Sequence, residues 1–102
     1  MNINLIPELA EVIYDAASSG KLARPEVLAA MLVLFPKCPH CGRPGVWGAV
    51  VAKGDGLYGA ALIAPGQYWH ADFTTKDLAT RELRRRGLEI ERSFGDCSAR
   101  LN

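Results

Sequence analysis

Two cysteines separated by two residues constrain this chain more than any other feature. The stretch Cys38-Pro39-His40-Cys41-Gly42 matches the spacing of a zinc knuckle, in which a tight turn points backbone N–H groups at two thiolate sulfurs. A glycine just after the second cysteine allows the positive φ that the chain reversal needs. The motif therefore predicts that a metal ion cross-links this fold.

The same spacing also occurs in redox-active dithiols. The tetrapeptide over residues 38–41 resembles the active-site motif of bacterial disulfide oxidases, and that resemblance implies thiol–disulfide exchange. In redox proteins the motif opens a helix whose N-terminus activates the attacking thiol, whereas residues 42–45 of this chain form a turn sequence. We therefore favour zinc and keep a thiol–disulfide oxidoreductase as a distant alternative.

A structural zinc ion takes four protein ligands, and the sequence offers few further donors. Cys97 is the only other cysteine, and His70 lies in an alternating segment that places it on one strand face with Tyr68 and Asp72. Asp72 could then orient the imidazole. His40 or a carboxylate remains an alternative fourth ligand, His70 could be an ordinary strand histidine, and Cys97 could be a small buried hydrophobe. The predicted metal site consists of Cys38, Cys41, His70 and Cys97.

Composition indicates an ordinary folded domain. The chain has 102 residues, of which 49% are hydrophobic and 23% charged, so we expect one zinc-stabilised domain over residues 1–102. A net charge of +1 gives no field that would attract nucleic acid or a membrane surface. No signal peptide is apparent, the longest apolar run is too short to span a bilayer, and three cysteines do not suggest a disulfide framework. We therefore expect a cytoplasmic protein.

The pattern of apolar residues and turn signals predicts an α+β fold. We expect two N-terminal helices, the zinc knuckle, and a mostly antiparallel sheet of about four strands, with one further helix between the last two strands. Thr74 would cap that helix and Gly87 would end it. The second N-terminal helix is apolar nearly all round, and both faces of the sheet could be covered, one of them by a partner. The four strands are expected over residues 46–52, 57–64, 67–73 and 88–94.

Two groups of side chains are candidates for binding a partner. The helix over residues 75–86 carries Arg81, Arg84 and Arg85, which could bind phosphates or carboxylates, although acidic neighbours would partly neutralise them. Tyr68 and Trp69 are adjacent in a strand, so only one of them is expected to face inward.

No motif in the sequence supports catalysis. A nucleophile elbow, a phosphate-binding loop and a His-Glu-x-x-His sequence are all missing. We therefore predict a small zinc-binding module that binds a protein and acts as an adaptor, regulator or inhibitor, of the kind common among bacterial and phage accessory proteins. The alternative is a nucleic-acid-binding zinc protein that uses the arginines of residues 81–86.

Overall fold

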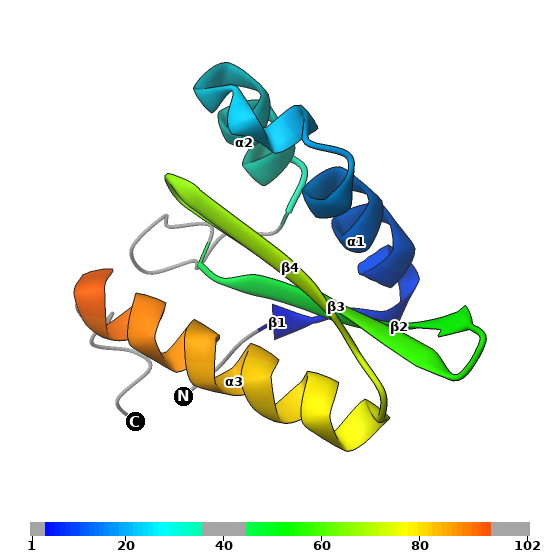
Figure 1. Ribbon diagram of the computed structural model, residues 1–102. Helices are drawn as coiled ribbons and strands as arrows, with labels where there is room; N and C mark the ends of the chain where they lie inside the picture. The colour runs from blue at the N-terminus through cyan, green and yellow to red at the C-terminus, as the bar shows by residue number, and fades with distance from the viewer. Residues whose placement is uncertain (1–3, 36–44, 95–102) are drawn as a thin grey trace.

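A short antiparallel sheet lies at the centre of the fold, with helices on both of its faces (Figure 1). The computed structural model describes residues 4–35 and 45–94. Along the chain the elements are β1 (Asn4–Leu5), the 3₁₀ helix η1 (Pro7–Leu9), α1 (Ala10–Ser18), the 3₁₀ helix η2 (Lys21–Ala23), α2 (Pro25–Val33), β2 (Trp47–Gly54), β3 (Leu57–Ala64), β4 (Gln67–Phe73) and α3 (Lys76–Phe94).

The three long strands form a meander, as the sequence predicts. The sheet order is β1-β2-β3-β4, and β2, β3 and β4 pair antiparallel with their neighbours in the chain. Asp55 and Gly56 both have positive φ, which is the geometry of the tight turns that match strand twist. Gly66 also has positive φ and follows Pro65 in the second turn. Two residues of β1 add a short parallel pairing to β2.

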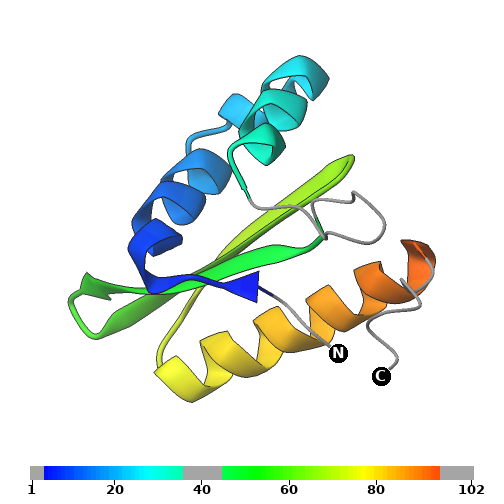
Figure 2. The same ribbon diagram turned by 180° about the vertical axis from the view of Figure 1, so that it is seen from behind.

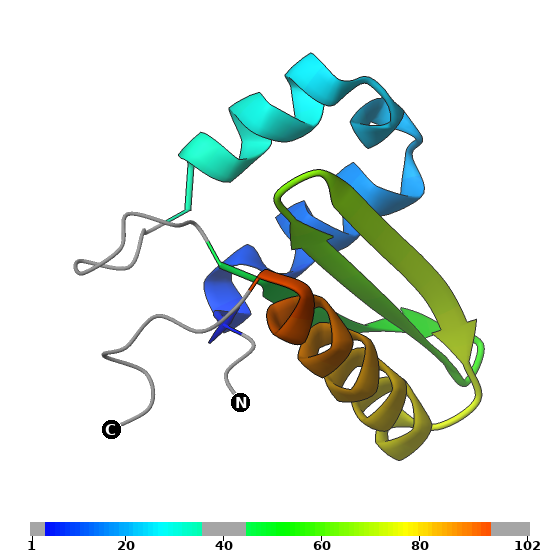
Figure 3. The same ribbon diagram turned by 90° about the vertical axis from the view of Figure 1, so that its left-hand side faces the viewer.

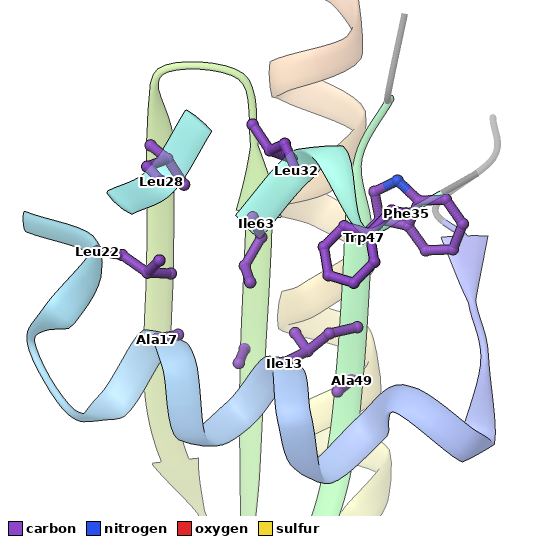
Figure 4. Packing of buried hydrophobic residues seen from close by; sticks show 10 residues of the cluster. Ile13, Ala17, Leu22, Leu28, Leu32, Phe35, Trp47, Ala49 and Ile63 are labelled. Atoms are coloured by element: carbon purple, nitrogen blue, oxygen red, sulfur yellow. The ribbon is translucent and has the colours of Figure 1, made fainter. Parts of the chain in front are cut away.

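Each face of the sheet packs on its own helical layer, as the views from front and back show (Figures 1 and 2). We call the face covered by α1 and α2 the α1 face, and the opposite one the α3 face. The sequence allowed a partner to cover one face, but α3 of the same chain covers it. Figure 4 shows the core on the α1 face, which includes Ile13, Ala17, Leu22, Leu28, Leu32, Phe35, Trp47, Ala49 and Ile63. The core on the α3 face consists of Val46, Ala60, Leu62, Ala64, Ala79 and Leu83.

The predicted fourth strand over residues 88–94 is wrong. Helix α3 continues through Gly87 to Phe94, so the antiparallel sheet has three strands and the helix follows the last of them. Residues 83, 87 and 90 lie at helical spacing toward the sheet, so the apolar positions of this segment fit a helix as well as a strand. The helix begins after Thr75, not Thr74, because the Thr75 hydroxyl accepts a 3.1 Å hydrogen bond from the Leu78 N–H.

The second helix is less enclosed than its composition suggests. Leu28 and Leu32 of α2 are buried against the sheet, but Val33 and the following Leu34 are 68% and 71% exposed. Helix α2 therefore turns only one side toward the core and leaves apolar side chains in solvent at its C-terminal end.

Candidate functional site

The structure describes only one of the four predicted metal ligands. Cys38, Cys41 and Cys97 lie outside the described residues, as do the knuckle and its turn. His70 lies in the middle of β4, is exposed, and meets the Tyr14 ring edge-on with centroids 6.5 Å apart. Among the residues that the structure describes, no three His, Cys, Asp or Glu side chains gather in a way that could hold a metal. Because all three cysteines are outside that part, this finding does not bear on zinc.

Asp72 takes part in a different arrangement from the one predicted. Its Oδ1 accepts a 2.8 Å hydrogen bond from the Tyr14 hydroxyl, and its Oδ2 forms a 2.8 Å ion pair with Lys53 Nζ. The hydrogen bond from Lys53, and then the one from Tyr14, lower the pKa of Asp72, and the same contact with Asp72 raises the pKa of Lys53. Lys53 Nζ also lies 5.5 Å from the centre of the Tyr14 ring. These contacts tie α1 to β2 and β4.

Gly59 makes this arrangement possible. It is the residue of β3 opposite Asp72, and the Tyr14 ring lies directly over it. A Cβ at this position would lie within 3.0 Å of three ring atoms, so only glycine leaves room for the tyrosine. Sequence reasoning missed this contact, although a glycine inside an apolar strand is a signal of close approach.

An apolar groove opens between α2 and the turn that joins β3 to β4. We call it the α2 groove; its volume is about 530 Å³. Leu28 and Leu32 lie at the base of α2 beside the sheet (Figure 4), and Tyr68 comes from the start of β4. The lining residues are Leu22, Ala23, Pro25, Leu28, Ala29, Leu32, Pro65, Gly66, Gln67 and Tyr68.

Tyr68 and Trp69, the two predicted aromatic contacts, lie on opposite faces of the sheet. Tyr68 lines the α2 groove, while Trp69 is on the α3 face, where the Arg86 guanidinium lies 4.6 Å from its ring centre and Phe73 lies 6.3 Å away. The sequence predicted that only one of the two would face inward, but because helices cover both faces, both side chains are half-buried.

The arginines of α3 are not one basic surface. Arg85 pairs with Glu82 at 2.7 Å and with Glu89 at 3.1 Å, and its hydrogen bond lowers the pKa of Glu82. In the described part of the chain neither Arg81 nor Arg84 forms an ion pair. Arg84 lies with Lys76 and Thr80 along a second groove of about 480 Å³, whose apolar side is formed by Ala10 and by residues 5–7 and 48–50. The predicted basic residues are therefore divided among different surroundings.

Two further findings bear on the class of protein. Within residues 4–35 and 45–94, no helix has the length and apolar character needed to cross a bilayer. Comparisons with protein-family models, with curated proteins and with solved structures found no match to this chain.

Proposed function

We propose that this protein is a zinc-stabilised interaction module of the cytoplasm that binds another protein at the α2 groove and acts as an adaptor, regulator or inhibitor. The observation that supports this proposal most directly is the groove itself, an apolar hollow with the exposed Val33 and Leu34 at the end of the same helix. Exposed apolar surface of this kind is characteristic of protein–protein contacts.

The chemistry of the groove suits a few apolar side chains of a partner. Its volume lies in the range of pockets that enclose small ligands or anchor residues. Tyr68 adds an aromatic surface with a polar tip, which is a common feature of residues that dominate binding energy. An Arg24–Glu26 ion pair, 2.6 Å long and well exposed, flanks Pro25 of the lining and contributes polar surface beside the groove.

The charges of α3 favour a protein partner over nucleic acid. Glu82 and Glu89 flank Arg85, and Arg86 lies over the Trp69 ring. Phosphate binding relies on several available cations, and the predicted basic stretch retains only Arg81 and Arg84 without such contacts among the described residues. Nucleic-acid binding through this helix remains the alternative proposal.

A photo-crosslinking amino acid in place of Ala29 tests the groove. Ala29 is an exposed lining residue, and Ala52 on β2 is an exposed position away from the groove that serves as control. We expect a single protein adduct from position 29 in the cells that make this protein, and none from position 52. The purified partner should then bind wild type, while Tyr68→Ala should weaken the affinity about tenfold or more, as loss of a central aromatic does.

The outcome that would contradict the groove is equal binding by wild type and Tyr68→Ala. Micromolar or tighter binding to random DNA or RNA at physiological salt, lost when Arg81 and Arg84 are both changed to Glu, would support the alternative.

Elemental analysis tests the zinc part of the proposal. Protein purified without added metal should contain one zinc ion per chain, held by Cys38, Cys41, Cys97 and His70. Cys38→Ser should lose the metal and several kcal/mol of stability, because the binding energy of a structural zinc is also folding energy. His70→Gln distinguishes the fourth ligand, since a variant that keeps its zinc with unchanged affinity would exclude His70.

A further inference from the structure

Among the described residues, no strand pairs with the outer edge of β4. β4 is the last strand in the sheet order, and its other neighbour is β3. The helices lie above and below the sheet and not beside this strand, as two perpendicular views agree (Figures 1 and 3). At the opposite side of the sheet, β1 pairs with the start of β2. Within the described residues, β4 therefore presents seven residues of backbone without a strand on its outer side.

This edge lacks the features that usually prevent strands from pairing with another chain. Natural edge strands carry proline, a bulge, unpaired charges or a covering element. β4 contains no proline, and its register with β3 is regular from Gln67 to Phe73. Its only acidic or basic side chain besides His70 is Asp72, which Lys53 and Tyr14 already hold. An uncovered, regular and nearly uncharged edge has a strong tendency to accept another strand.

We propose that β4 pairs antiparallel with β4 of a second copy of this chain, around a twofold axis at His70. His70 is the midpoint of the strand, so this register overlaps all seven residues. The sequence of β4 is compatible with antiparallel pairing to a second copy of itself. In this register the large Trp69 lies opposite the small Ala71 of the other copy, and Tyr68 lies opposite Asp72. Large residues facing small ones pack well across paired strands.

The wider surroundings also favour a second copy as the occupant. The twofold axis keeps the α1 faces of both copies on the same side, so each helical layer continues from one copy into the other. The half-buried Trp69 and Phe73 on the α3 face would become less exposed to solvent when the second copy packs beside them. A net charge of +1 per chain gives little repulsion between copies. This inference does not depend on the α2 groove or its partner.

Sedimentation equilibrium of the full chain tests the proposal. We expect a dimer mass at the upper end of a concentration range from about 1 µM to about 500 µM, with dissociation on dilution, as suits a micromolar complex. A monomer mass throughout this range would overturn it.

A charge-swap experiment tests the position of the axis. His70→Lys places two like charges opposite each other in the homodimer, and His70→Glu does the same with the opposite sign, so each variant alone should be monomeric. Mixed in equal amounts, the two should form a heterodimer, because a lysine then faces a glutamate. Ala52→Lys, which adds a charge on β2, should dimerise as wild type does.

Each outcome decides between alternatives. Dimers of both single variants would exclude β4 as the interface. If both single variants are monomeric and their mixture forms no heterodimer, the register around His70 is excluded. This outcome would be expected if the substitutions acted only by removing a metal ligand. Thermal unfolding checks that the fold is intact, with His70→Gln as the reference because it removes the same predicted zinc ligand without adding a charge. His70→Gln should dimerise as wild type does, and the two charged variants should unfold at its melting temperature.

Discussion

The two faces of the sheet are covered in different ways. On the α3 face one helix of 19 residues runs along the strands, and its Ala79 and Leu83 are fully buried against residues of β3. On the α1 face the cover is divided between α1 and α2, each nine residues long, with η2 between them.

This difference explains where the molecule offers a binding surface. The continuous helix α3 packs Ala79 and Leu83 against the sheet, and the groove on this face lies beside the helix, with Lys76 and Arg84 along it. Two short helices cannot both lie along the same strands, so α2 sits beside the β3–β4 turn and the α2 groove opens under it. At the other end of the α1 face, Tyr14 closes the contact by lying over Gly59. The divided layer therefore forms its groove between α2 and the β3–β4 turn, whereas the groove on the other face has two cations, Lys76 and Arg84, in its lining.

The largest expected effect compares the same truncation on the two faces. Leu83→Ala should lower the free energy of unfolding by about 3 kcal/mol, because it leaves a cavity at a fully enclosed position. Leu28→Ala should cost only about 1 to 2 kcal/mol, because Leu28 lines a groove that water can enter. Urea denaturation measures both. Equal losses would mean that the α1 face is packed as tightly as the α3 face.

The next effect tests the close approach on the α1 face. Gly59→Ala should cost about 2 kcal/mol, since the new methyl group displaces the Tyr14 ring from the sheet and breaks its hydrogen bond to Asp72. In a Tyr14→Ala background the same substitution should cost much less, because the obstructing ring is gone. Strictly additive losses in this double-mutant cycle would contradict the contact.

A smaller effect is expected from the cation on the α3 face. Arg86→Met removes the guanidinium from above Trp69 and should cost about 1 kcal/mol, the usual magnitude for a partly desolvated cation–π pair. Arg81→Met on the same helix is the matched control, and its effect should stay within about 0.5 kcal/mol, as for other surface substitutions. If both variants unfold at the same urea concentration, the contact between Arg86 and Trp69 does not contribute to the stability of the fold.

The smallest effect concerns the acid stability of the α1 face. The pKa of Asp72 is lowered in the folded protein, so its contribution is present above the pKa of the unfolded chain and is lost as pH falls through the folded value. The melting temperature of wild type should therefore fall as the pH is lowered below about pH 4, where carboxylates protonate. The melting temperature of Asp72→Asn should fall less steeply with decreasing pH. The same dependence of melting temperature on pH in both proteins would show that Lys53 and Tyr14 do not stabilise the charged carboxylate.

The sequence predicts the three-stranded meander well and the C-terminal half of α3 less well. Turn residues and a composition rich in Val, Ile, Ala and aromatics identified β2 and β3. Two-residue alternation identified β4, including the opposite orientations of Tyr68 and Trp69. The last segment was assigned to a strand because Leu88, Ile90 and Phe94 share a face at two-residue spacing. The ion pair of Arg85 with Glu89, which spans Gly87, could not be weighed from sequence alone.

The candidate sites depended on tertiary placement. The α2 groove joins residues of η2 and α2 to the β3–β4 turn, and no local pattern specifies how those elements meet. The open edge of β4 likewise follows from strand order. The predicted cysteine ligands lie outside the described residues and stay a prediction.

The order of strands also has a consequence for how the chain folds. β2, β3, β4 and α3 follow one another without a break, and each pairs or packs with near neighbours in sequence, so this half has short loops to close. The parallel pairing of β1 with β2 spans both N-terminal helices and the cysteine segment, so it carries the larger entropic cost. We therefore expect residues 47–94 to form a nucleus first and the N-terminal layer to dock on it later, with pulse-labelled hydrogen exchange showing early protection of β3 and late protection of α1.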